Sequence, residues 1–286
     1  MIEFPVPGTG RVAVVVPAPG TGPGYWAGAP SAGHAAGGSL LIAYRLRTPG
    51  RRGASVVVAT SQDGERLVTV ATLDRERFGA ESLERPALVR LDHGWRMYVS
   101  CATPHSKHWR IDVLDVDDPG RFGEATPRTV FPGDEHVGVK DPVIRRAGGL
   151  WHAWVCCHPL DDAGEEDRMT TAYATSREGL EWTWHGEVLA GRAGRWDARG
   201  ARVTSVLPDG RASYDGRASK QENFSERTGI AMPAHRSRLS AGEGEPVANV
   251  RYLDLVPTGA GGFLAFYERP RDDGSHELCM ERFAGR

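Results

Sequence analysis

Lys140-Asp141-Pro142-Val143-Ile144 has the composition of a short β-strand, and Leu150-Trp151-His152-Ala153-Trp154 follows it after a glycine turn. A third strand is expected at 169–176, ending in Ser176-Arg177-Glu178-Gly179, a turn of the Ser-x-Asp/Glu-Gly kind. Runs rich in β-branched and aromatic residues between Gly, Pro and Asp turns are typical of antiparallel strands. This stretch serves as a template for the rest of the chain.

The same order of strands and turns recurs five times. With Pro142 as the reference, the equivalent positions are 30, 86, 142, 201 and 253, which are separated by 56, 56, 59 and 52 residues. The second strands are then expected at 40–44, 95–98, 150–154, 211–214 and 263–267, and the third strands at 54–61, 109–115, 169–176, 226–232 and 276–281. Repeats of about 40–50 residues with four short strands are typical of β-propeller blades.

The repeat predicts an all-β protein, a five-bladed β-propeller in which residues 1–286 form one unit. The predicted blades span 25–78, 81–122, 137–190, 196–240 and 249–283. A β-sandwich is the alternative, but it does not explain two identical steps of 56 residues between proline positions. In the fourth repeat Ala201 replaces the proline, so the register depends there on the turn at Tyr214-Asp215-Gly216.

Composition excludes several classes of function. The net charge is -2 and no basic run is present, so we expect neither nucleic acid nor a membrane as a partner. The first residues lack a basic leader, and the apolar run 12–16 is too short to span a membrane, which favours a cytoplasmic protein. The four cysteines include no CxxC pair, and no HExxH is present, so we expect free thiols, no metal and no cofactor.

In a propeller, the first strand of each blade lines the central channel. The residues that open these strands are Gly28-Ala29, Glu84-Arg85, Lys140-Asp141, Arg199-Gly200 and Arg251-Tyr252. Charged side chains buried at such a hub must pair with one another or meet a ligand. Two interpretations remain open: salt bridges that plug the channel, or a polar pocket for a hydroxylated or anionic ligand.

These residues resemble the five-bladed propeller glycoside hydrolases, namely the arabinanase/xylosidase, invertase-like and mannoside-phosphorylase-like groups. The resemblance spans about residues 20–285 and rests on 140–142 with 149–154, on 176–179 with Trp182, and on 214–216. It implies three hub carboxylates: a base in blade one, a helper that adjusts a pKa in blade three, and an acid in blade four. Asp141 matches the helper, but Ala29 and Arg199-Gly200 stand where the base and the acid are expected.

Glycoside hydrolysis requires a carboxylic acid and a second carboxylate that acts as base or nucleophile. The catalytic candidates are therefore Glu84, Asp141 and Asp215. Aromatic faces stack on sugar rings, and charged or imidazole side chains bind hydroxyl groups. The candidates for substrate binding are Tyr25, Trp26, Arg85, His105, Lys140, His158, Asp197, Arg199, Arg251 and Glu268.

The leading hypothesis is a hydrolase that processes a small glycoside or a glycosylated metabolite by carboxylate acid/base chemistry, with a sugar as its partner. The first alternative is a diverged propeller enzyme, such as a lyase, a cyclase or another hydrolase that tailors a small molecule. The second is a carbohydrate-binding module without catalysis. The missing carboxylates at two matching positions keep all three open, because a fold alone does not specify a function.

Overall fold

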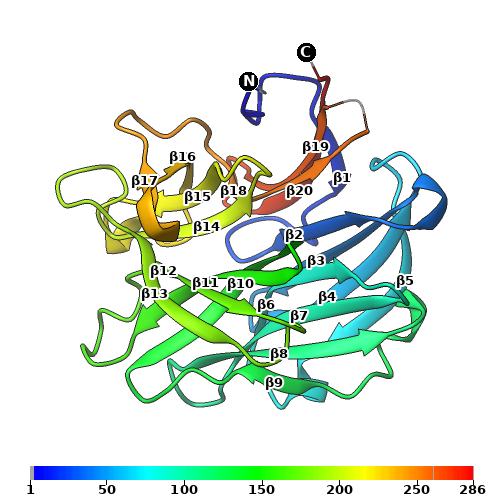
Figure 1. Cartoon of the computed structure of the whole chain (residues 1–286), viewed down its shortest axis with the longest axis horizontal. Coiled ribbons are helices and arrows are strands. Elements are labelled where there is room, and N and C mark those ends of the chain that lie inside the picture. The colour runs from blue at the N-terminus through cyan, green and yellow to red at the C-terminus, as the bar shows by residue number, and fades with distance from the viewer. Residues whose placement is uncertain (1–2, 260, 286) are drawn as a thin grey trace.

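The computed structural model describes residues 3–259 and 261–285 and consists almost entirely of β-strands joined by loops (Figure 1). The all-β prediction is therefore confirmed. Within these ranges the helical elements are short 3-10 turns: η1 (Ala36–Gly38), η2 (Arg75–Phe78), η3 (Pro119–Arg121), η4 (Lys220–Glu222) and η5 (His235–Ser237). None of the helices in this part of the chain is long and apolar enough to cross a membrane.

The strands of the described residues form four hydrogen-bonded sheets. Three of these sheets have four antiparallel strands in chain order: β6 (Leu83–Arg90), β7 (Trp95–Ala102), β8 (Trp109–Val116) and β9 (Arg128–Phe131); β10 (Val137–Ala147), β11 (Leu150–Pro159), β12 (Thr170–Ser176) and β13 (Thr183–Ala190); β14 (Gly200–Val206), β15 (Ala212–Arg217), β16 (Arg227–Pro233) and β17 (Leu239–Ala241). The fourth sheet has eight strands: β1 (Ala13–Val16), β2 (Trp26–His34), β3 (Leu40–Thr48), β4 (Arg51–Ser61), β5 (Val68–Asp74), β18 (Arg251–Pro257), β19 (Phe263–Pro270) and β20 (His276–Phe283).

The eight-stranded sheet has a narrow joint between its first and last strands. Strands β2 and β20 meet through a single parallel pair, Trp26 with His276. Along the same edge of β20, opposite β19, β1 pairs antiparallel with β20, so the N-terminal strand lies beside the C-terminal strand (Figure 1). Glu281 on β20 fixes this arrangement, since its carboxylate accepts hydrogen bonds from the amides of Gly8 at 2.6 Å and Gly10 at 2.9 Å.

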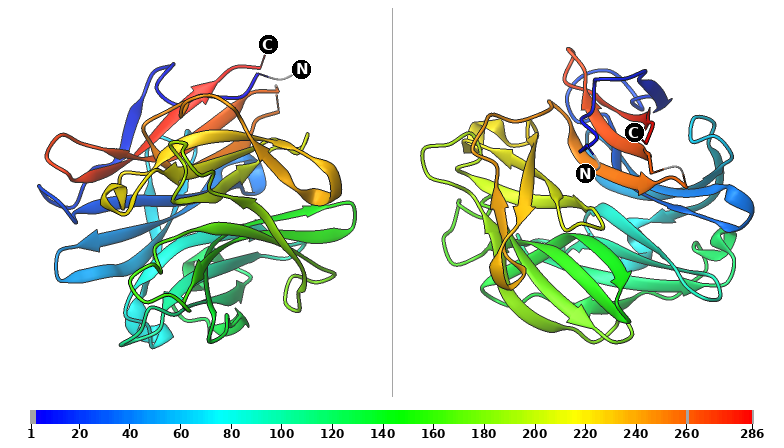
Figure 2. Two further views of the ribbon diagram at one scale, coloured as in Figure 1. Left: turned by 90° about the vertical axis from the view of Figure 1, so that its left-hand side faces the viewer. Right: turned by 45° about the horizontal axis from the view of Figure 1, so that its top comes forward.

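The first strands of the sheets surround one axis. Strands β2, β6, β10, β14 and β18 contact one another in sequence, and β18 contacts β2, so that the ring closes (Figure 2). Apolar side chains fill the spaces between neighbouring sheets; Leu41 and Val56, for example, pack against Met97 and Val99 of the next sheet. The polar first strands therefore form the hub, and the hydrophobic core lies around it.

Most strands lie where the repeat predicts them. The five second strands, β3, β7, β11, β15 and β19, begin at or within one residue of the predicted positions. Two strands differ from the predicted blades: β9 lies beyond residue 122, and β1 lies before residue 25. Both are four residues long, too short for a clear pattern in the sequence.

The observed pairing of the strands shows that one of the predicted equivalent positions, Pro86, is offset by one residue. A β-bulge interrupts the pairing of β2 at 29–30, of β6 at 84–85, of β10 at 141–142 and of β18 at 252–253. Arg85, and not Pro86, is thus equivalent to Pro30 and Pro142. Glu84 is equivalent to Asp141. Pro30 and Pro142 lie within their bulges, whereas Pro86 lies one residue beyond its bulge. Aligning the prolines therefore hid this offset of one residue.

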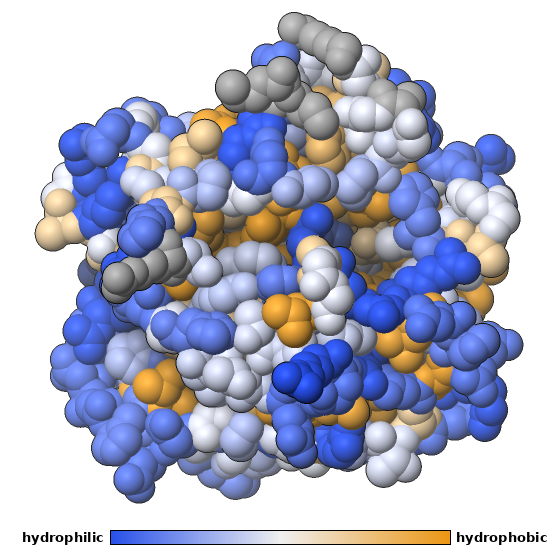
Figure 3. Space-filling model, in the orientation of Figure 1, coloured by the Kyte–Doolittle hydropathy of each residue, from blue (hydrophilic) through white to orange (hydrophobic). Residues whose placement is uncertain are grey.

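Most of the face seen in Figure 3 is hydrophilic. The large apolar side chains that are exposed among the described residues are widely separated in the sequence: Val14, Val68, Leu150, Trp184, Phe224, Met232 and Val247.

The contacts of Glu281 predict that the Glu281→Gln variant is less stable. An amide in its place brings an NH₂ donor toward backbone N–H donors, so we expect the free energy of unfolding to fall by about 2 kcal/mol. Urea denaturation followed by fluorescence measures this change. Glu243→Gln is the matched control, because the Glu243 side chain is 87% exposed. Equal stability of the two variants would show that β1 is held without this carboxylate.

Candidate active site

The bulges on the first strands determine which side chains reach the hub. Bulges re-aim a side chain relative to the regular alternation of a strand. Ala29, Asp141 and Tyr252 occupy the first bulge position of their strands with φ angles of 49°, 50° and 53°. A positive φ is strained for residues other than glycine and is kept where the surroundings impose it. Ser100 contributes at Asp141, where its hydroxyl accepts a hydrogen bond from the amide at 2.8 Å.

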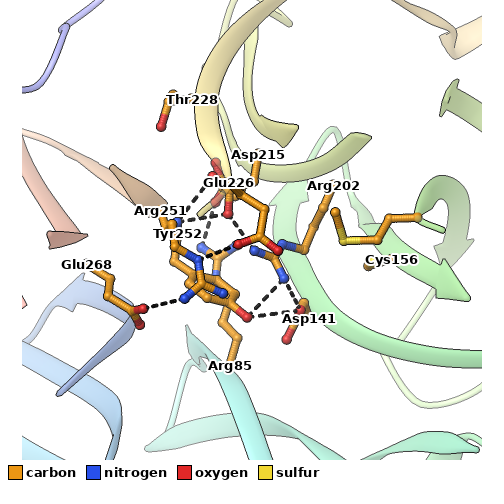
Figure 4. Close-up of polar contacts among 12 residues, drawn as sticks. Arg85, Asp141, Cys156, Arg202, Asp215, Glu226, Thr228, Arg251, Tyr252 and Glu268 are labelled. Atoms are coloured by element: carbon orange, nitrogen blue, oxygen red, sulfur yellow. Dashed lines mark hydrogen bonds and ion pairs between the residues drawn. The ribbon is translucent and has the colours of Figure 1, made fainter. Parts of the chain in front are cut away.

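Arg202 of β14 lies at the centre of the hub (Figure 4). Its guanidinium donates to Asp141 at 2.8 Å, to Asp215 at 2.6 Å and to the Tyr252 hydroxyl at 2.9 Å, and it lies 3.9 Å from the centre of the Tyr252 ring. The backbone amide of Tyr252 in turn donates to Asp215 at 3.0 Å. Arg202 thus joins three of the four sheets.

Arg251 of β18 forms a second group of ion pairs. It contacts Glu226 at 2.7 Å and Glu268 at 2.7 Å. Arg45 pairs with Glu268, Arg217 pairs with Glu226, and His276 donates to Glu268 at 2.6 Å. Each of these two glutamates therefore has at least two cationic neighbours. The interpretation in which charges bridge one another at the hub describes this layer well.

A cavity of about 400 Å³ opens above the paired charges. Its aromatic and apolar wall residues are Trp26, Trp109, Met169, Phe224 and Tyr252. Seven cationic residues line it against four acidic ones: Arg52, Lys107, Lys140, Arg202, Arg217, Lys220 and Arg251, and Glu84, Glu166, Asp167 and Glu226. The walls thus carry a surplus of positive charge. A larger hollow of about 720 Å³ lies between residues 3–10 and 261–285, away from the hub charges.

The predicted site residues fall into four groups. Those on the cavity wall are Trp26, Glu84, Lys140, His158 and Arg251. Those buried in ion pairs but absent from the wall are Asp141, Asp215 and Glu268. Arg85 lines a different cavity, at the other end of the hub. Outside the cavity wall lie Tyr25, His105, Asp197 and Arg199.

Two residues of the last group, Arg199 and Asp197, have identifiable partners elsewhere. Arg199 binds Asp167 at 2.6 Å and Glu165, so the hub side chain of its sheet is Arg202 and not the predicted Arg199-Gly200 pair. Asp197 binds Arg192 at 2.9 Å and accepts from the Tyr214 hydroxyl at 2.9 Å. Both residues therefore hold the segments next to β14 in place.

Several hub residues are not among the predicted site residues. For one of them, Arg45, the sequence contains a signal that could have identified it. Two of the predicted residues, Asp215 and Glu268, directly follow the tyrosine of a second strand, and Arg45 follows Tyr44 in the same way. Arg202, Arg217 and Glu226 carry no such signal, because their positions depend on strand register. Tyr252 was placed in the hub but was not named as a binding residue.

Nearby positive charges lower the pKa values of three hub carboxylates, those of Glu226, Asp141 and Glu268. Burial raises the pKa of Glu226, but Arg251, Arg202 and Arg217 more than offset it and lower the pKa to about 2. The same balance lowers the pKa of Asp141 to about 2, with Lys140 and Arg202 as the main stabilising charges. The pKa of Glu268 also falls well below its usual range, because Arg45 and Arg251 outweigh burial. These three side chains stay ionised at neutral pH.

Glu84 has a different environment. It lines the cavity, and within the described residues its contact with a charged partner is the Arg45 Nε atom at 3.6 Å. No hydrogen bond to its carboxylate is found in that part of the chain. Lys140 lies nearby on the wall, 4.6 Å above the Trp109 ring and 3.6 Å from Asp141. Among the acidic side chains of the hub, Glu84 is the one that is least engaged and faces the cavity.

Comparison with known proteins supports this architecture. No protein-family model and no curated protein matches the sequence. Solved structures do match: a thermostable family-43 glycoside hydrolase has a TM-score of 0.72 at 13% identity, covering 94% of this chain and 92% of its own. The β-1,2-mannobiose phosphorylase from Listeria innocua has a TM-score of 0.65 at 12% identity, covering 98% and 92%. Sucrose-6-phosphate hydrolase from Lactobacillus gasseri has a TM-score of 0.66 at 10% identity, covering 96% and 62%. The predicted resemblance to the propeller glycoside hydrolases is confirmed at the level of the fold.

His158 provides a test of the buried site. Its Nδ1 donates to the Glu166 carbonyl at 2.9 Å, and burial together with Lys140 lowers the pKa of the imidazole to about 3. The unfolded chain binds a proton near pH 6.5 and the folded chain does not, so stability is complete above pH 6.5 and falls as the pH drops toward 3. Between pH 7.5 and 5.5 the wild type should lose about 1.4 kcal/mol more than His158→Gln in urea denaturation.

His93→Gln is the control for this measurement, because His93 is exposed on a turn. It should keep the pH dependence of the wild type. If His158→Gln keeps it as well, the imidazole of His158 takes up its proton in the folded protein over the same pH range as in the unfolded chain.

Proposed function

We propose that the protein cleaves the glycosidic bond of a small sugar bound in the hub cavity, with Glu84 transferring the proton to the leaving oxygen. One observation carries the proposal: Glu84 faces the cavity without a hydrogen bond, while the other hub carboxylates are bound by arginines. A general acid must be free to hold a proton and to reach the scissile oxygen. Glu84 lines the cavity, from where its carboxyl group can reach such an oxygen.

The other two predicted catalytic residues receive supporting roles in this proposal. Asp141 and Asp215 are fully buried and hold Arg202 from two sides. An arginine held in this way presents fixed N–H donors toward a bound ligand, without reorganisation when the reaction occurs. Arg202 also lines the cavity. We therefore infer that Asp141 and Asp215 position Arg202, and do not exchange protons with the substrate.

The nucleophile in this proposal comes from solution. Among the hub carboxylates of the described residues, Glu84 alone faces the cavity without a hydrogen bond, so in this proposal the group that attacks the anomeric carbon is a water molecule or an inorganic phosphate ion. Positively charged walls concentrate anions in a cleft. The surplus of Lys and Arg therefore favours either phosphate as the nucleophile or a negatively charged group on the sugar. The phosphorylase and sugar-phosphate hydrolase among the structural neighbours support both possibilities.

The proposal extends to the architecture. We infer that the eight-stranded sheet counts as two blades, because a single residue pair joins β2 to β20. This interpretation gives five blades around the ring of first strands, all belonging to one unit.

A substrate panel tests the proposal. We expect one or more of aryl glycosides, β-1,2-mannobiose and sucrose 6-phosphate to be cleaved, and Glu84→Gln to lower kcat about 10²–10⁴-fold while KM changes little. Assays with and without inorganic phosphate identify the nucleophile: a new phosphate ester at the anomeric carbon, formed only when phosphate is added, indicates phosphorolysis, and cleavage without added phosphate indicates water.

Two variants control this experiment. Glu181→Gln, at an exposed position, should leave turnover unchanged. Asp141→Asn should lower both stability and kcat, since it removes a partner of Arg202. Full activity of Glu84→Gln would exclude the assigned role, and sugar binding without cleavage of any substrate would favour the carbohydrate-binding module.

A further inference from the structure

A second cavity, of about 230 Å³, lies at the opposite end of the ring of first strands. The active-site cavity contacts the beginnings of these strands, such as Trp26 on β2 and Arg251 on β18. The second cavity contacts later residues of the same strands, among them Ser31 on β2 and Asp254 on β18. The two cavities are therefore separated along the axis of the hub.

Hydrogen-bond donors outnumber acceptors among the side chains of the second cavity. Arg145 on β10 lines it and has no hydrogen bond or ion pair within 3–259 and 261–285. The hydroxyls of Ser31 and Ser205 accept hydrogen bonds from the backbone amides of Leu88 and Leu255. Their own O–H groups find no acceptor in the same ranges, so they remain available to a ligand.

Arg85 adds a second positive charge at this end. Its guanidinium donates to the Thr204 carbonyl at 2.6 Å and to the Pro30 carbonyl at 3.3 Å, and its Nη1 atom is buried without a partner among the described residues. The acidic residue of this cavity is Asp254, 3.4 Å from Arg85, and one of its oxygens already accepts from the amide of Ala32. Two arginines thus face one carboxylate.

We propose that this second cavity binds a small oxyanion of the phosphate or carboxylate type, held by Arg145 and the hydroxyls of Ser31 and Ser205. The guanidinium fork matches two oxygens of such a group, and a partly buried site strengthens the attraction. A neutral ligand could accept hydrogen bonds from these donors but would not pair with the positive charge of Arg145. The site is distinct from the proposed active site and does not depend on it.

Selenate and inorganic phosphate serve as probes. Crystals soaked in selenate should show an anomalous peak beside Arg145 in the wild type and none there in Arg145→Gln. In calorimetric titrations with inorganic phosphate, Arg145→Gln should weaken binding to this site at least about tenfold. A parallel titration with acetate tells whether a carboxylate group is sufficient. Arg145→Gln should fold normally, because within the described residues the side chain has no hydrogen bond or ion pair to lose.

Lys107→Gln, on the wall of the active-site cavity, is the matched control and should leave the second site unchanged. The proposal is overturned if the wild type shows no selenate peak at Arg145. It is also overturned if phosphate affinity is the same in wild type and Arg145→Gln, or if only Lys107→Gln abolishes binding.

Discussion

The hub depends on one buried cation, the guanidinium of Arg202. Removing its charge from water is costly, and the carboxylates of Asp141 and Asp215 with the hydroxyl of Tyr252 compensate that cost. These partners come from strands of three different sheets, so the sheets must keep their relative positions for the charges to stay paired. Loss of one partner from such a group costs about 3–5 kcal/mol, because it leaves an uncompensated buried charge.

The same pairing divides the acidic residues of the hub into two kinds. Asp141 and Glu226, which arginines bind, stay ionised at neutral pH, as their lowered pKa values show. Glu84 stands at the same bulge position as Asp141 but faces the cavity. The two acidic residues differ in backbone and in surroundings: Asp141 has a φ of 50° and an ion pair with Arg202 at 2.8 Å, whereas Glu84 has no positive φ and its charged contact is Arg45 at 3.6 Å. The proposed division of labour between Glu84 and Asp141 follows from this difference.

The sequence located the strands more reliably than the site. Second strands such as 95–98 and 263–267 are apolar and aromatic between glycine turns, and this local pattern is sufficient to find them. Asp141, Glu84 and Arg251 were expected at the hub because they open the first strands, which the same kind of local pattern locates. Arg202 and Glu226 were missed because they lie inside or beside strands whose register only long-range pairing defines. Strand β1 was missed because its partner, β20, lies at the other end of the chain.

By itself, the sequence determined the all-β class, the repeated order of strands and the presence of acidic and basic residues where the first strands begin. These properties follow from local periodicity and turn chemistry, which each segment carries independently. Only the tertiary structure decided which carboxylate is free, that Arg202 and not Arg199 occupies the hub, and that the channel has a cavity at each end. These properties depend on distances between residues far apart in the chain, and such distances exist only once the ring of strands has closed.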